Sequence, residues 1–208
     1  MQKGVVKVVN NGPMWNVEGR GAFYEFIDET SLKHLFFITC YHILATSSKL
    51  EIINNVTIKS EFIPQLNTFH FMKEHLLSCW TNRTFDVTII ELTTNGGKCF
   101  RERGGEFIKI GQATLNSNII TVLQSTKEDF TFANGRILEL DMNKIKYFIS
   151  TEIGISGTPI INWDCDAICI YCKEENSNNI IGETNKLPQF QQLTFTLRDV
   201  LNFYFEER

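Results

Sequence analysis

The sequence has little of what marks several other classes of protein. No apolar run approaches the roughly 18 residues of a membrane-spanning helix, and no segment near Met1 has the composition of a signal peptide. No run of Lys and Arg stands out, and the net charge is −4, which argues against a nucleic-acid groove. We therefore expect a soluble, cytoplasmic protein that binds neither membrane nor nucleic acid.

Helix signals are also scarce. They are confined to a short turn at residues 40–46 and to a terminal segment, 196–208, whose apolar residues fall at helical spacing. About a dozen short segments rich in Val, Ile, Phe and Thr, among them residues 50–53, fill the rest and often alternate with polar residues. Turn residues separate them, as at 95–97, and Asn134-Gly135 is the clearest hairpin signal. This pattern predicts an all-β barrel or sandwich with a C-terminal helix.

The length of 208 residues, with 43% hydrophobic residues and 17 Phe, suits one large β domain or two small barrels packed together. The six cysteines come without a secretory signal, so we expect free thiols. Cys169 and Cys172 have C-x-x-C spacing, but residues three apart on a strand point to opposite faces and no second such pair exists. We expect no metal and no cofactor.

The search for a catalytic base is short, because the chain has only four histidines. His42 follows the apolar segment 35–39 and opens a short helical turn, a corner that would hold a base rigidly. A histidine satisfied in the core or at a helix end is the alternative. His70 and His75 have no such corner, and both are predicted to be strand and surface residues.

The sequence also contains a candidate orienting acid and a candidate nucleophile for this histidine. Asp86 stands at the mouth of the apolar segment 87–92, where burial would be costly unless another group accepts its charge. Ser156 lies in a turn between Gly154 and Gly157, which lets backbone N–H groups face one point. The alternatives are an Asp that caps a turn and a plain surface turn.

Three motifs together carry a resemblance to a known family. The segments FFITCYHILA, FDVTIIEL and GISGTPIIN resemble the His, Asp and Ser segments of trypsin-like, chymotrypsin-fold serine proteases, in that family's order and at intervals of 44 and 70 residues. Residues 19–23 are similar to the G-x-G-F segment before the His strand. The resemblance implies two packed six-stranded antiparallel β-barrels, residues 1–100 and 101–195, followed by a C-terminal helix over 196–208.

The resemblance also implies a chemistry. His42 would be the base, Asp86 its orienting acid and Ser156 the nucleophile, with the N–H groups of Gly154 and Ser156 binding the oxyanion. The chain would be a serine endopeptidase that cleaves polypeptides through an acyl-enzyme. A self-processing domain of a longer parent polypeptide, and a weakly active peptide-binding pseudoprotease, are the alternatives.

The chain departs from the secreted digestive members of that family at the nucleophile. Ile155 stands where those members have the Asp that pairs with a newly cut N-terminus, and Thr158 replaces a second glycine. In this respect the chain resembles the intracellular, high-temperature-requirement-like branch. Activation by N-terminal trimming is therefore not expected.

Overall fold

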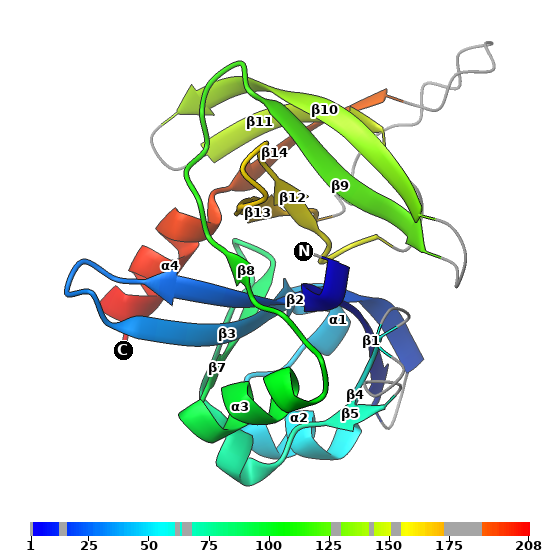
Figure 1. Cartoon of the computed structure of the whole chain (residues 1–208), viewed down its shortest axis with the longest axis vertical. Helices are drawn as coiled ribbons and strands as arrows, with labels where there is room; N and C mark the ends of the chain where they lie inside the picture. Colours follow the sequence, from blue (N-terminus) through cyan, green and yellow to red (C-terminus); the bar gives the residue numbers. More distant parts are fainter. Residues whose placement is uncertain are drawn as a thin grey trace.

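Two sheets make up most of the molecule (Figure 1). The structure is a computed structural model that describes residues 2–12, 16–60, 63, 68–125, 130–141, 144–150, 155–172 and 189–208. Within this described part of the chain, no helix is both long and apolar enough to cross a membrane. The predicted all-β class with a C-terminal helix is confirmed, and the architecture is chymotrypsin-like.

The first sheet curls into a half-barrel with the strand order β5-β4-β1-β2-β3-β7-β6, and β8 pairs in parallel with β2. Its strands are β1 (Val5–Asn11), β2 (Asn16–Ile27), β3 (Lys33–Cys40), β4 (Val56–Lys59), β5 (Phe69–His70), β6 (Leu76–Asn82), β7 (Val87–Leu92) and β8 (Ile108–Lys109). Aromatic rings fill its core, where Phe23 stacks on Phe100 with ring centroids 3.7 Å apart. Since β7 is buried throughout and β3 is buried after its first residue, the residues next to their ends are rigidly supported.

The second sheet is a nearly closed barrel of six antiparallel strands, in the order β13-β12-β9-β10-β11-β14. Its strands are β9 (Asn118–Ser125), β10 (Phe130–Asp141), β11 (Lys144–Ser150), β12 (Pro159–Ile161), β13 (Ala167–Ile170) and β14 (Gln189–Phe195). Alternate residues of β11, namely Ile145, Tyr147 and Ile149, are fully buried, as the two-residue period of a strand requires. The predicted boundary between the two barrels at residue 100 stays a prediction. Strand β8, which follows that boundary in sequence, pairs with β2 of the first sheet.

The described helices are short and lie at the ends of strands. They are α1 (Tyr41–Leu44), α2 (Lys49–Asn55), α3 (Thr94–Glu102) and α4 (Leu197–Glu206), with 3-10 turns η1 (Gln2–Gly4) and η3 (Lys73–His75). The C-terminal helix is where the sequence predicts it. Its N-cap is Thr196, and its four apolar residues at helical spacing are all buried, namely Leu197, Val200, Leu201 and Tyr204.

The strand predicted at residues 50–53 is wrong, because this segment is part of α2. The side chain of Ser48 caps this helix by accepting a hydrogen bond from the N–H of Glu51. Ser48 and Glu51 have the spacing of a capping box, a signal for a helix start that outweighs the short apolar run at residues 50–53. The strand prediction therefore overlooked a helix N-cap that can be recognised in the sequence.

The hairpin predicted at Asn134-Gly135 is also wrong, because both residues lie inside the continuous strand β10. This long strand pairs with β9 on one side and with β11 on the other. A Cβ atom on Gly135 would collide with the carbonyl oxygen of Phe148 on β11. The glycine is therefore needed for close approach between strands and not for a turn.

The turn predicted at residues 95–97 is the first turn of α3. Thr93 caps this helix by accepting a hydrogen bond from the N–H of Gly96, and a Cβ on Gly96 would collide with the carbonyl oxygen of His75. The glycine thus lets α3 pack tightly on η3. For the same reason His75 is buried, at 5% exposure, and the predicted surface position is wrong.

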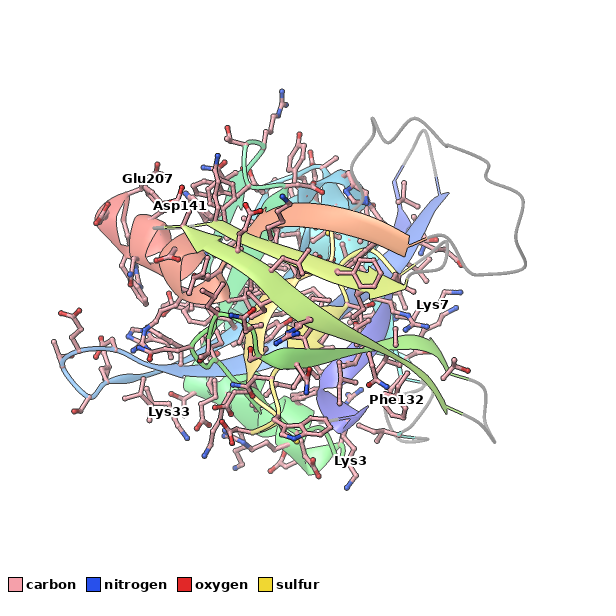
Figure 2. All side chains as sticks on the ribbon, turned by 90° about the horizontal axis from the view of Figure 1, so that it is seen from above. Lys3, Lys7, Lys33, Phe132, Asp141 and Glu207 are labelled. Carbon is pink, nitrogen blue, oxygen red and sulfur yellow. The ribbon has the colours of Figure 1, made fainter. Side chains whose placement is uncertain are left out.

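Side chains project from the ribbon all around the molecule, and Lys3, Lys7 and Lys33 are among those labelled (Figure 2). Three lysines labelled there form ion pairs with glutamates. They are Lys3 with Glu106 at 3.0 Å, Lys7 with Glu18 at 2.6 Å and Lys33 with Glu25 at 2.6 Å. At these positions the positive charge is neutralised by neighbouring carboxylates.

Candidate active site

His42 lies where the sequence predicts a strand-to-helix corner. Strand β3 ends at Cys40, and His42 is the second residue of the four-residue helix α1. The helix stops at Ala45, a left-handed residue whose N–H donates to the carbonyl of Tyr41. The backbone of His42 is therefore held next to the end of a buried strand, while 42% of the His42 side chain stays exposed.

Asp86 contacts His42 twice. Its Oδ2 lies 2.7 Å from Nδ1 of His42, and its Oδ1 accepts the backbone N–H of His42 at 3.0 Å. A third bond, from the N–H of Tyr41 to the carbonyl of Asp86, joins the two backbones at 2.9 Å. The carboxylate therefore selects the tautomer with its proton on Nδ1, which leaves the lone pair of Nε2 to accept a proton.

Ser156 sits in a turn that the following residues fix. The N–H and the side-chain hydroxyl of Thr158 both donate to the carbonyl of Ile155, at 2.9 and 2.6 Å. Gly157 has a φ of +86°, which favours glycine, and its N–H donates to the carbonyl of Tyr171 at 2.7 Å. Thr158, the departure from the second glycine of the family motif, thus closes the turn through its hydroxyl.

The serine turn is bonded directly to the first sheet. The N–H of Arg20 on β2 donates to the carbonyl of Ser156 at 2.9 Å, and a Cβ on Gly157 would collide with the carbonyl oxygen of Arg20. The hydroxyl of Thr39 on β3 donates to the carbonyl of Arg20 at 2.6 Å. Because Thr39 is three residues before His42, the turn packs against the strand that carries the base.

A further connection runs through the segment after β13. The carbonyl of Tyr171, which accepts the N–H of Gly157, also accepts the thiol of Cys40 at 3.3 Å. The thiol of Cys172 lies 3.3 Å from that of Cys40 and donates to the carbonyl of Asp86 at 3.7 Å. These bonds link the serine turn, the segment before His42 and the backbone of Asp86.

Cys40, Cys172 and Asp86 also form the one group of potential metal ligands found among the described residues, with ligand atoms within 4.8 Å of one another. Burial raises the pKa of the Cys40 thiol well above its ordinary value, and the contact with Cys172 acts in the same direction. The other described cysteines are also free thiols.

The structure brings some of the predicted site residues together, and one of them lies outside the described residues. His42 and Asp86 are in direct contact, and the turn of Ser156 is bonded to β2 beside the strand that leads to His42. Gly154 lies outside the described residues. The sequence interpretation missed Arg20, since only the G-x-G-F resemblance marks its segment.

Comparisons with known proteins agree on the fold. No family model and no curated protein matches the chain. Among solved structures, the active form of the Rv3671c protease from M. tuberculosis aligns with a TM-score of 0.60 at 15% identity, over 97% of this chain and 79% of that one.

Two viral structures align similarly. The serine protease domain of the Sesbania mosaic virus polyprotein has a TM-score of 0.59 at 13% identity and covers 97% and 91% of the two chains. The tobacco vein mottling virus protease has a TM-score of 0.55 at 15% identity, with 86% and 74% covered. At these identities the likeness shows a shared chymotrypsin-like fold.

Proposed function

We propose that the chain is a serine endopeptidase with His42, Asp86 and Ser156 as its catalytic triad. The observation that carries the proposal is the contact between His42 and Asp86, combined with a serine turn bonded to the neighbouring strand. Residues 44 positions apart meet with the atoms that a base and its orienting acid require. The fold shared with serine proteases supports the same reaction class.

In the proposed mechanism, Nε2 of His42 takes the hydroxyl proton of Ser156 as its oxygen attacks a peptide carbonyl. The proton then passes to the leaving amine, and water hydrolyses the acyl-enzyme. Asp86 stabilises the imidazolium through the bond to Nδ1. The N–H groups of Ser156 and Gly154 bind the oxyanion, an interaction of about 3 kcal/mol for each donor in related cases.

We further propose the branch and the setting of this activity. Ile155 is 1% exposed and belongs to the core of the second barrel, where it occupies the place of the activation Asp in digestive members of the family. This supports a relation to the intracellular, high-temperature-requirement-like branch. A cytoplasmic location, where the thiols would stay reduced, goes with it.

A self-processing role is the second candidate function. The observation that favours it is the fold shared with the protease domain of a viral polyprotein. In that case the substrate is a peptide segment of the parent chain, and the same triad cleaves it. A peptide-binding pseudoprotease would use the same fold without cleavage.

A fluorophosphonate probe tests the proposed nucleophile, since it reacts only with an activated serine. We expect the probe to label the wild-type protein but not the Ser156→Ala variant. Ser47→Ala, at an exposed serine after α1, is the matched control and should be labelled like the wild type. Equal labelling of wild type and Ser156→Ala would show that the assignment of Ser156 is wrong.

The same proteins separate the two alternatives. A pseudoprotease would bind peptides with no labelling of the wild type. A self-processing domain would be labelled, and it would cleave its own parent segment much faster than an added peptide. Thermal unfolding of Ser156→Ala shows whether the variant remains folded.

A further inference from the structure

Two thiols lie next to the pair formed by His42 and Asp86, one of them two residues before His42 and the other in contact with the carbonyl of Asp86. Cys40 ends β3 with no exposed surface, and Cys172 follows β13 with its side chain half-buried. Their Sγ atoms are 3.3 Å apart, although the residues are 132 positions apart in sequence. The contact joins a strand of the first sheet to a segment of the second, two residues before the base.

The surrounding hydrogen bonds do not depend on these thiols. The carbonyl of Tyr171 accepts the N–H of Gly157 as well as the Cys40 thiol. The carbonyl of Asp86 accepts the N–H of Tyr41 as well as the Cys172 thiol. Both carbonyls therefore keep an amide donor if the two sulfurs bond to each other, so oxidation leaves no buried carbonyl without a partner.

A cation is a poorer occupant for this place than a sulfur–sulfur bond. Both carboxylate oxygens of Asp86 already accept hydrogen bonds from His42, so a metal ion would compete with the base for them. Metal binding also requires both thiols to be thiolates, whereas burial raises the pKa of Cys40. Disulfide formation needs only one thiolate at a time, and Cys172 is the more accessible sulfur.

We propose that Cys40 and Cys172 are a modification site, a dithiol that a hydroperoxide oxidises to a disulfide. The Cys172 thiol loses its proton, and the thiolate attacks the terminal oxygen of the hydroperoxide and becomes a sulfenic acid. The departing oxygen takes that proton and leaves as an alcohol or water. The Cys40 sulfur then displaces the sulfenic hydroxyl, which leaves as water with the Cys40 proton. Two thiols lose two hydrogen atoms, and one peroxide is reduced.

The disulfide would change the geometry around the base. A sulfur–sulfur bond is about 2.05 Å long, so the two sulfurs must approach from their present 3.3 Å. Cys40 is followed directly by the helix that carries His42, and Cys172 follows Tyr171, which binds the serine turn. Because a 1 Å misplacement costs about 100-fold in related sites, we expect activity to fall by roughly 10- to 100-fold on oxidation.

The cross-link is tested by peptide mapping, which requires no enzymatic activity. Purified protein is treated with hydrogen peroxide, alkylated without reductant and digested with trypsin. The proposal predicts a disulfide between the peptide of residues 34–49, whose only cysteine is Cys40, and the peptide of residues 147–173. Further cleavage before Asp166 separates Cys165 from the other two cysteines of the second peptide.

Two variants assign the second sulfur. Cys172→Ser keeps a donor for the carbonyl of Asp86 and should abolish the cross-link. Cys165→Ser removes an exposed thiol in the same peptide and should leave the cross-link intact. A cross-link that persists in Cys172→Ser, or that does not form in wild type, overturns the proposed site.

Peptide cleavage before and after peroxide then tests the effect on the site, and this part rests on the proposed function. Wild type and Cys165→Ser should lose activity and recover it with dithiothreitol, whereas Cys172→Ser should keep its own starting activity. A cross-linked wild type of unchanged activity overturns the proposed control. A wild type that forms the cross-link but has no activity before treatment contradicts the proposed function and leaves the dithiol site supported.

Discussion

At the scale of single residues, the site depends on backbone conformations that few residues adopt easily. Asp86 has a φ of +49° and Ala45, at the end of α1, a φ of +51°. Such left-handed conformations are uncommon outside glycine, but Asp and Asn tolerate them better than most residues. Asp86 therefore meets two requirements at once, since the position needs a carboxylate for His42 and a residue that accepts this turn.

An Asp86→Asn variant separates these two requirements. Asn also tolerates positive φ, so the free energy of unfolding should stay near that of wild type. The amide no longer selects the Nδ1 tautomer of His42, and we expect kcat to fall by roughly 10⁴-fold, as in the serine-protease triad. Steady-state peptide cleavage measures this fall.

Asp164→Asn is the matched control for this variant, because Asp164 is an exposed aspartate in the turn between β12 and β13. It should retain wild-type kcat. If Asp86→Asn kept most of its kcat while remaining folded, Asp86 would not be the orienting acid.

At the scale of elements, the start of α3 packs against η3 and contacts the buried residue His75 in the first half-barrel. The ring of His75 stacks on Phe69 at 5.8 Å, and its Nδ1 accepts the N–H of Met72 at 3.2 Å. The carbonyl of His75 accepts the N–H of Thr93, where α3 begins. Burial lowers the pKa of His75, so the neutral ring is the form that the folded state favours.

This lowered pKa predicts that protonation of His75 weakens the fold. The unfolded chain binds the proton at the ordinary histidine pKa and the folded chain only at lower pH, so stability is lost as pH falls below that ordinary value. The free energy of unfolding should therefore drop more from pH 7 to pH 5 in wild type than in His75→Asn, whose amide can accept the Met72 N–H without titrating. Urea unfolding at both pH values measures it.

The exposed His70 on β5 supplies the control, since His70→Asn should keep the wild-type difference between the two pH values. An equal drop in wild type and His75→Asn would show that the burial of His75 does not contribute to the pH dependence.

Elements with a strong local pattern were predictable, and those decided by packing were not. The C-terminal helix follows from its apolar spacing, and the strand before His42 from its run of apolar residues. Gly96 and Gly135 were interpreted as turn residues, whereas the structure uses both for close backbone contact. Sequence alone does not separate these two uses of glycine, because the contacting atoms belong to other segments.

The same limit applies to the site. His42, Asp86 and Ser156 could be proposed as candidates from the sequence because each stands in a local motif. The bond from Arg20 to the carbonyl of Ser156, and the contact between Cys40 and Cys172, join segments more than 130 residues apart. Neither residue type suggests its partner, so these supports come only from the structure.

At the scale of the whole molecule, the C-terminal helix joins the two halves. Strand β14 belongs to the second sheet and leads directly into α4, which packs on the first (Figure 1). The hydroxyl of Tyr204 on this helix donates to Oε2 of the buried Glu91 on β7 at 2.7 Å. The ring of Phe85, next to Asp86, contacts both Phe195 and Phe203, at 4.4 and 5.1 Å. The helix and the end of β14 thus pack against β7 and against the residue next to Asp86 of the proposed triad.

The last prediction concerns how the serine turn becomes ordered in the intact molecule. In digestive members of the resembling family, a newly cut N-terminus forms an ion pair beside the nucleophile. If Ser156 is the nucleophile, as proposed, the corresponding position here is Ile155, which is buried in the core of the second barrel. An ammonium against it would cost several kcal/mol without a partner. The turn is instead fixed by Thr158 and by the bond from Arg20.

Order in this turn therefore does not require a free N-terminus, and an N-terminal extension should leave peptide cleavage within about twofold, well below the tenfold effect of 1.4 kcal/mol. The measurement compares kcat/KM of the Met1 chain with that of a chain extended by a flexible, uncleaved peptide. If the extended chain were inert and trimming to one defined residue restored activity by orders of magnitude, a new N-terminus would order the turn despite Ile155.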